Sequence, residues 1–287
     1  MRTGAGLIAG SIAGPIAGSI MPVFAGVLAL SSSFAFAADP WADRVVEYNA
    51  GLNPAAGRTN PATALGEPTR FTGVAAGFPG AVTPFSPAFE ADAIVSIGAG
   101  GSLTLAFDEP IIDDPANPFG IDLLVFGNSF VFDDINFTDL ALVFSSDGGR
   151  IEVSADGADW REIIGVEADG LFPTLGYADT SAYFGAPAGI VPTDFTLPVD
   201  PSVNLIGLNF AQILAAYGGS GGGAGVDLAS VGLSSASFVR FSLPAGATGN
   251  IEIDGVSDVR AIPAPASVLV ITGGLFASMA ASRRRRS

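Results

Sequence analysis

Short apolar segments separated by glycine-containing turns recur along this chain and restrict it to folds built mainly from β-strands. The segments follow one another at intervals of about ten residues between residues 93 and 164, and two more lie at residues 238–243 and 250–256. Leu103, Leu105 and Phe107 alternate with other residues, as a strand with one buried face requires. This spacing predicts an all-β chain forming one antiparallel β-sandwich or jelly roll.

The turns between these segments carry their own signals. Residues 93–97 and 102–107 are predicted as two strands joined by a glycine turn. The nearly continuous apolar run at residues 121–126 is typical of a strand covered on both faces. Asp147-Gly148-Gly149 and Asp156-Gly157 indicate hairpins, because Asp-Gly accepts a positive φ. Further strands are predicted at residues 140–144, 150–153 and 160–164.

One short helix interrupts the β pattern. It is predicted at residues 210–217, where Gly218-Gly219 would end it. Residues 53–92 and 165–202 lack a regular pattern and are rich in Pro, Gly and Phe. Loops of this length in a compact domain are usually functional, and their phenylalanines predict that they pack against the domain.

The absence of three residue types, His, Cys and Lys, limits the reactions and metal sites that this chain can support. The chain has no His and no Cys, and all 12 of its basic residues are Arg. These absences exclude Ser–His and Cys–His nucleophile pairs, disulfides, zinc sites with the usual ligands, Schiff-base chemistry and a P-loop. Carboxylate, amide and backbone oxygens remain, so we expect a binding protein and not an enzyme. A glycoside hydrolase with two carboxyl groups stays the less favoured alternative.

Charge is distributed unevenly along the chain. The net charge is −16, whereas residues 38–262, with all 28 acids and seven Arg, carry −21. The two ends together carry +5. A chain of net charge −16 should be repelled by nucleic acid, and the asymmetry indicates that the ends face a different environment.

The N-terminal segment has the features of a secretory signal peptide. Arg2 precedes an apolar stretch, and Ala35-Phe36-Ala37 forms an A-x-A cleavage site. We therefore predict a signal peptide at residues 1–37, cleaved after Ala37. An uncleaved anchor, or a start at Met21, are the alternatives.

The C-terminal segment has three parts: Pro263-Ala264-Pro265, an apolar run at residues 266–282, and Arg283-Arg284-Arg285-Arg286. As a helix, the apolar run would be roughly 26 Å long, the short end of a membrane span. The arginines would hold their end in the cytoplasm and leave the large domain outside. A transmembrane helix at residues 266–282 is the prediction.

This tripartite tail resembles the PEP-CTERM sorting signal of Gram-negative bacteria. The resemblance covers residues 261–287, and this sequence has Ala264 where that signal has its name-giving Glu. It implies export, retention at the inner membrane, and recognition by an exosortase-type processing protease. The protein would then be membrane-anchored, or released to the cell surface or extracellular matrix.

The middle segment resembles bacterial cell-surface proteins built as galactose-binding-like jelly rolls. Residues 64–68, 95–108 and 122–128 carry that resemblance, and residues 151–160 are similar to the strand, Asp-Gly turn and aromatic residue of discoidin-type domains. The resemblance implies one β-sandwich ectodomain at residues 38–262. It also implies binding of glycans or matrix, often beside a structural calcium ion.

Calcium is the cofactor that this composition can serve, because it takes carboxylate and carbonyl oxygens. Residues 134–138 mimic the start of an EF-hand loop, but Asp139 stands where glycine is required. Residues 222–229 nearly fit a calcium-binding β-roll repeat, yet one copy cannot build a β-roll. The densest acid-rich stretch of the chain, at residues 108–139, also includes Asp122. Candidate metal ligands are Asp113, Asp114, Asp133, Asp134, Asn136 and Asp139, with solvated loop acids as the alternative.

Aromatic side chains give a second set of candidates. The chain has 21 Phe but 2 Trp and 4 Tyr, a bias that favours packing over sugar-stacking surfaces. Tyr177 and Tyr183, in the long segment at residues 165–202, are the candidate ligand-binding residues. The expected function is a structural or adhesive protein of the cell envelope or exopolysaccharide matrix. A carbohydrate-binding module with structural calcium is the alternative.

Overall fold

A computed structural model describes residues 39–260 of the protein. The predicted signal peptide with Ala35 and Ala37 lies outside the described residues. So do the transmembrane segment and the sorting residues, namely Pro263, Ala264, Pro265, Arg283, Arg284, Arg285 and Arg286. No helix within residues 39–260 is long and apolar enough to cross a bilayer.

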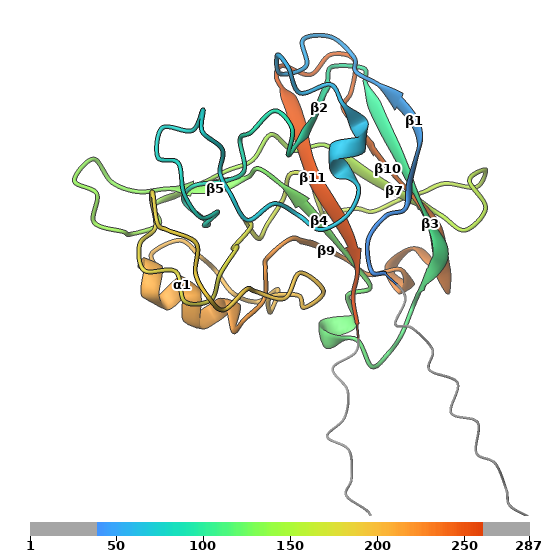
Figure 1. Ribbon diagram of the computed structural model, residues 1–287. Helices are drawn as coiled ribbons and strands as arrows, with labels where there is room; N and C mark the ends of the chain where they lie inside the picture. The colour runs from blue at the N-terminus through green and yellow to red at the C-terminus, as the bar shows by residue number, and fades with distance from the viewer. Residues whose placement is uncertain (1–38, 261–287) are drawn as a thin grey trace, which may run out of the picture. The chain divides into compact units, whose positions relative to one another are not determined.

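Within residues 39–260, eleven strands form three antiparallel sheets, and this part of the chain is mostly β, as the sequence predicts (Figure 1). The five-stranded sheet has the order β1 (Arg44–Asn49), β3 (Ser102–Ile112), β10 (Ser235–Ser242), β7 (Arg150–Ser154) and β8 (Arg161–Glu162). The four-stranded sheet has the order β2 (Val95–Gly98), β11 (Asn250–Asp258), β4 (Leu123–Gly127) and β9 (Ala224–Val226). The third is a hairpin of β5 (Phe130–Phe132) and β6 (Val143–Ser145).

The two large sheets pack face to face around one apolar core, as in a β-sandwich. Side chains alternate between buried and partly exposed along β10, so that sheet presents its other face to solvent. The residues that meet between the sheets include Leu103, Leu105, Ile151, Val153, Val239 and Phe241 from one sheet, and Val95, Ile97, Leu123, Val125, Ile251 and Ile253 from the other.

The four-stranded sheet is covered on both faces. Every residue of β2 and of β4 is buried. On the outer face, Leu124 and Phe126 of β4 pack with Phe195, and the Phe126 and Phe195 rings meet edge to face at 5.1 Å. Phe195 comes from residues 165–202, so this irregular segment covers the sheet and confirms the predicted burial of residues 121–126 on both faces.

The helix and the irregular segments lie beside the sandwich (Figure 1). Their apolar side chains form a second cluster there. The helix α1 (Phe210–Tyr217) matches its predicted bounds. Asn209 and Gln212 form a capping box at its start, and Gly218 ends it in the left-handed conformation. The 3-10 helices are η1 (Pro61–Ala64), η2 (Pro118–Gly120) and η3 (Ala229–Val231).

The predicted turns have different outcomes. Asp156-Gly157 joins β7 and β8, which pair as a hairpin. The glycine turn at residues 98–101 is not a hairpin, because β2 pairs with β11 and β3 pairs with β1 and β10. Its backbone bonds to other segments instead, through Gly98 N to Ala50 O and Gly100 N to Leu243 O. Asp147-Gly148-Gly149 likewise lies between β6 and β7, which do not pair with each other.

Candidate metal centre and acidic cavity

Three aspartates meet at one end of the sandwich. Asp113 follows β3, Asp122 precedes β4, and Asp227 follows β9. Because Leu123 pairs with Val226, the sheet register places Asp122 beside Asp227. Carboxylate oxygens of the three residues lie within 4.8 Å of one another.

The Asp122 carboxylate is the buried member of this group. It has no exposed surface, and its Oδ2 accepts a hydrogen bond from Leu228 N at 3.0 Å. Its Oδ1 accepts from Asn117 Nδ2 at 2.9 Å and from Asp114 N at 3.2 Å. Burial raises the pKa of Asp122, the hydrogen bonds oppose that rise, and the charge of Asp113 adds to it.

Further acidic side chains lie at this end of the sandwich. A small cavity of about 270 Å³ is lined by Asp114, Asn117, Asp258 and Arg260, among others. Burial raises the pKa of Asp258 to about 6, Arg260 lowers it, and the charge of Asp122 raises it further. The local charge is therefore strongly negative when the carboxyls are ionised.

This arrangement fits a hard cation bound by oxygen. Two oxygens that each lie about 2.3–2.6 Å from one Ca²⁺ ion are at most about 5 Å apart, and these three carboxylates meet that limit. Asp113, Asp122 and Asp227 would hold the ion, and its charge would offset their mutual repulsion. Among residues 39–260, no other set of three Asp or Glu side chains comes this close together.

The other predicted metal ligands lie elsewhere, in the connection between β5 and β6. Asp134 Oδ1 accepts hydrogen bonds from Asn136 N at 2.9 Å and Thr138 N at 3.2 Å. Asp133 accepts from the backbone of Asp134, Asp139 and Leu140. These carboxylates shape their own loop. The structure does not group Asp133, Asp134, Asn136 and Asp139 with Asp113 and Asp114.

Tyr183 lies in the second apolar cluster. Its ring packs at 5.1 Å from Phe85 and 4.7 Å from Phe184. Burial and a hydrogen bond to Asp133 raise the pKa of Tyr183 to about 12. Burial by itself would raise the pKa of Asp133, but hydrogen bonds from Tyr183 and three backbone N–H groups hold it below its usual value. Tyr183 therefore has a clear packing role.

Tyr177 lies apart from Tyr183, at a surface pocket of about 510 Å³ that Arg70 also lines. The Arg70 guanidinium already has hydrogen-bond partners within the protein. It donates to Gly176 O, to Thr193 and to Glu67 Oε1, and it stacks 4.1 Å from the Phe195 ring centroid. The pocket thus offers the aromatic rings of Phe71 and Tyr177 but no unpaired charge.

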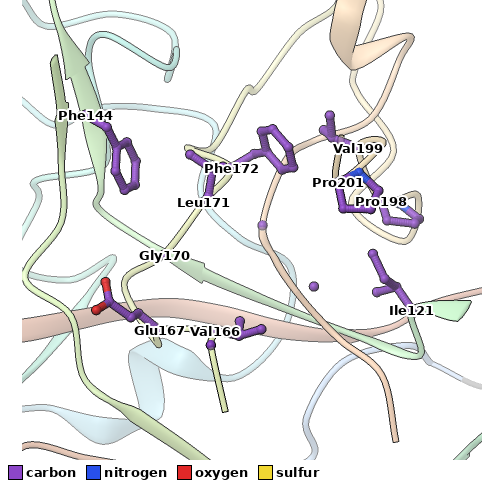
Figure 2. Close-up of a pocket in the computed structure, with 13 residues that line it drawn as sticks. Ile121, Phe144, Val166, Glu167, Gly170, Leu171, Phe172, Pro198, Val199 and Pro201 are labelled. Carbon is purple, nitrogen blue, oxygen red and sulfur yellow. The ribbon is translucent and has the colours of Figure 1, made fainter. Parts of the chain in front are cut away.

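A mainly apolar pocket of about 420 Å³ lies beside β4 and β9. Figure 2 shows Ile121 and Pro198 on one side of it and Phe144 and Glu167 on the other. Glu167 is its one charged lining residue, and the Glu167 carboxylate accepts a hydrogen bond from Ser146 Oγ at 3.0 Å. Few polar groups converge here, so the pocket has little means of selecting a ligand.

A different cavity, of about 340 Å³, is lined by three carboxyl groups, from Asp147, Asp169 and Glu252. Asn128, Asn250, Phe89 and Phe130 also line it, together with Ala55, Pro87, Ser129 and Ser145. The Asp169 and Glu252 residues are 1% and 4% exposed, whereas Asp147 is exposed at the cavity. We call this the acidic cavity.

The carboxyl groups that line this cavity have raised pKa values, and the charges of Asp147 and Asp169 contribute to these shifts. Burial raises the pKa of Asp169 to about 7, hydrogen bonds from the Asp147 and Ser129 backbone oppose the rise, and the Asp147 charge adds to it. Burial likewise raises the pKa of Glu252 to about 7, with further contributions from Asp147 and Asp169. Asp147 is more accessible, and partial burial of its carboxyl group also raises its pKa. Such perturbed groups cluster at functional sites.

Sequence reasoning missed both groupings. It identified Asp113 and Asp122 as part of an acid-rich stretch, but Asp227 is joined to them only by the pairing of β4 with β9. It explained Asp147 as a turn residue. Asp169 had no motif around it, and Glu252 is one polar residue within an apolar strand. No protein-family model matches the chain, and no curated protein is similar to it in sequence.

Proposed function

We propose that this protein is an exported, non-catalytic protein of the cell surface or exopolysaccharide matrix. Its antiparallel sandwich would be a jelly roll stabilised by one calcium ion, and its tail would be read by an exosortase-type protease. The observation that carries the calcium site is the convergence of Asp113, Asp122 and Asp227 from three separate elements. Export is supported by the signal-like N-terminus and the tripartite tail.

A structural ion is a useful stabiliser for this domain. Residues 38–262 contain no Cys, so no disulfide can hold the long irregular segments in place. The same residues carry −21, and that self-repulsion destabilises a compact state. An ion at Asp113, Asp122 and Asp227 would tie the ends of β3, β4 and β9 together and remove part of the repulsion.

The calcium proposal is tested by thermal unfolding of the full chain with calcium or with a chelator. At calcium concentrations about 100 times the dissociation constant, the folded state gains about 2.7 kcal/mol, which is about 5–10 °C in Tm for a domain of this size. Asp227→Asn and Asp113→Asn remove a charged ligand while keeping the side-chain shape, so we expect each to lose most of this shift.

Asp159→Asn is the matched control, because Asp159 is an exposed acid on the turn between β7 and β8. It makes the same change in net charge and should keep the full calcium shift. An equal shift in all three variants would mean that calcium acts as a diffuse counter-ion. No shift in the parent chain would remove calcium from the proposal.

A further inference from the structure

The connection between β5 and β6 carries a short sequence motif for covalent glycosylation. Asn136 is followed by Phe137 and Thr138, and Asn-x-Ser/Thr with x other than Pro is the acceptor motif for N-linked glycans in exported proteins. We propose that an oligosaccharide is attached to the side-chain amide of Asn136. This inference rests on the proposed export, which would bring the chain to the compartment where such acceptors are modified.

Asn136 is the only one of the nine asparagines in the sequence that fits this motif. Three others, Asn53, Asn60 and Asn117, are followed directly by Pro, which excludes them. The remaining five have no Ser or Thr two positions later, namely Asn49, Asn128, Asn204, Asn209 and Asn250. A modifying enzyme would therefore find a single acceptor in this chain, and the place of that acceptor in the fold decides whether it can be reached.

The position of Asn136 makes it accessible to an enzyme. The connection between β5 and β6 projects away from the two large sheets (Figure 1), and Asn136, Phe137 and Thr138 are all exposed. Within residues 39–260, the Asn136 amide nitrogen and the Thr138 hydroxyl each have one hydrogen-bond partner, in the same loop. Asn136 Nδ2 donates to Asp134 Oδ2 at 3.4 Å, and Thr138 Oγ1 donates to Asp133 Oδ1 at 3.5 Å. Both bonds are long, so both groups remain available.

The acceptor segment lies at the tip of this loop, where its backbone hydrogen bonds are local. The N–H groups of Asn136 and Thr138 both donate to Asp134 Oδ1. The loop is attached to the rest of the domain further along the chain, where Ala141 N donates to Leu208 O at 2.9 Å. The tip can therefore change conformation in the active site of an enzyme while the attachment at Ala141 is kept.

Exposed apolar side chains on either side of Asn136 favour a glycan at this position. Ile135 is 92% exposed and Phe137 is 63% exposed. Apolar groups exposed together promote association between molecules. An oligosaccharide on Asn136 would be attached between these two side chains and would shield them, because such glycans are bulky and solubilising. Glycosylation thus accounts for two apolar residues that the fold leaves largely uncovered.

The reaction is a glycosyl transfer from a lipid-linked oligosaccharide diphosphate, catalysed by an oligosaccharyltransferase. A bond forms between Asn136 Nδ2 and the anomeric carbon of the first sugar. The bond between that carbon and the diphosphate oxygen breaks, and the lipid diphosphate leaves. One amide proton is released, Asn136 keeps its other N–H, and nothing is oxidised or reduced.

The test is peptide mass spectrometry of the protein, purified from the cells that naturally produce the full chain. We expect the peptide containing Asn136 to carry added mass that fragments into successive sugar residues, with the first sugar on Asn136. Asn136→Gln should lose the added mass completely, because it removes the acceptor amide. Thr138→Ala should also lose it although the amide is present, whereas Thr138→Ser should keep it because the hydroxyl is retained.

Asn204→Gln is the matched control, because Asn204 is an exposed asparagine without the motif, and this variant should keep the added mass unchanged. The proposal is overturned if Asn136 is unmodified, or if the sugar persists in Asn136→Gln, which would place it on another residue. Protease accessibility in intact cells reports export separately. An unmodified but accessible domain would leave the proposed surface function standing, whereas an unmodified and inaccessible domain would overturn both.

Discussion

Buried carboxyl groups are the residues that set the pH response of this domain. The pKa values of Asp169 and Glu252 rise from 3.8 and 4.5 to about 7, and burial is the main cause in both. The folded chain therefore holds these protons more tightly than the unfolded chain. Their contribution to stability is complete below about pH 4, falls as the pH rises through about 7, and is then lost.

We predict that the free energy of unfolding falls between about pH 4 and pH 7, by up to about 1.4 kcal/mol per pH unit for each proton bound. Asp169→Asn should make this slope shallower, because the amide does not titrate. Denaturant unfolding across that pH range measures both slopes. The acids with lowered pKa values, such as Asp156 and Asp179, act in the opposite direction at lower pH.

Asp159→Asn is the control for this comparison, because Asp159 is an exposed acid on the turn between β7 and β8 and the substitution makes the same change in net charge. It should leave the slope as in the parent chain. Parallel slopes in the parent and Asp169→Asn would show that Asp169 titrates with an ordinary pKa. The pH response would then have to be assigned to other groups.

A short sequence motif predicts the role of a residue only where the contacts of that residue lie within the same turn. Asp156 was expected in a hairpin turn, and it accepts hydrogen bonds from Ala158 N and Asp159 N there. Asp147 has the same Asp-Gly context, but its carboxyl lines a cavity completed by Asp169 and Glu252. No spacing in the sequence reveals that cavity, because its walls come from distant segments.

At the scale of elements, the periodic pattern predicts strands better than it predicts their partners. The helix at residues 210–217 was predicted to within its bounds because Gly218 ends it locally. Strands β2 and β3 were predicted, but not their assignment to different sheets, since pairing is decided by contacts with β11, β1 and β10. The short strands β5 and β9 have too few residues to show a period.

Strand β4 should be highly sensitive to truncation, because both of its faces are buried. Phe126→Ala removes a fully buried ring that packs on Phe195, and we predict a loss of about 3–5 kcal/mol in the free energy of unfolding. Denaturant unfolding measures this loss.

Phe132→Ala, in β5, is the matched control because Phe132 is 49% exposed. The same chemical change there should cost less than about 1.5 kcal/mol. Similar losses at the two positions would contradict the assignment of the outer face of β4 as a second buried surface.

At the scale of the whole molecule, charge and domain architecture support one account. A domain carrying −21 stays soluble at high local concentration and attracts divalent ions. Three of its acids, Asp113, Asp122 and Asp227, form the candidate metal centre, and three others line the acidic cavity. The positive charge at the two ends is what the proposed export and membrane orientation would require.

The central claim is that the C-terminal tail delivers this domain to the cell surface or matrix. The most direct measurement is the location of the protein after Arg283, Arg284, Arg285 and Arg286 are all replaced by Ser, followed by protease accessibility in intact cells. The account predicts that the parent domain is accessible and cell-associated or matrix-associated, whereas the variant loses that retention. Unchanged location of the variant would contradict the claim.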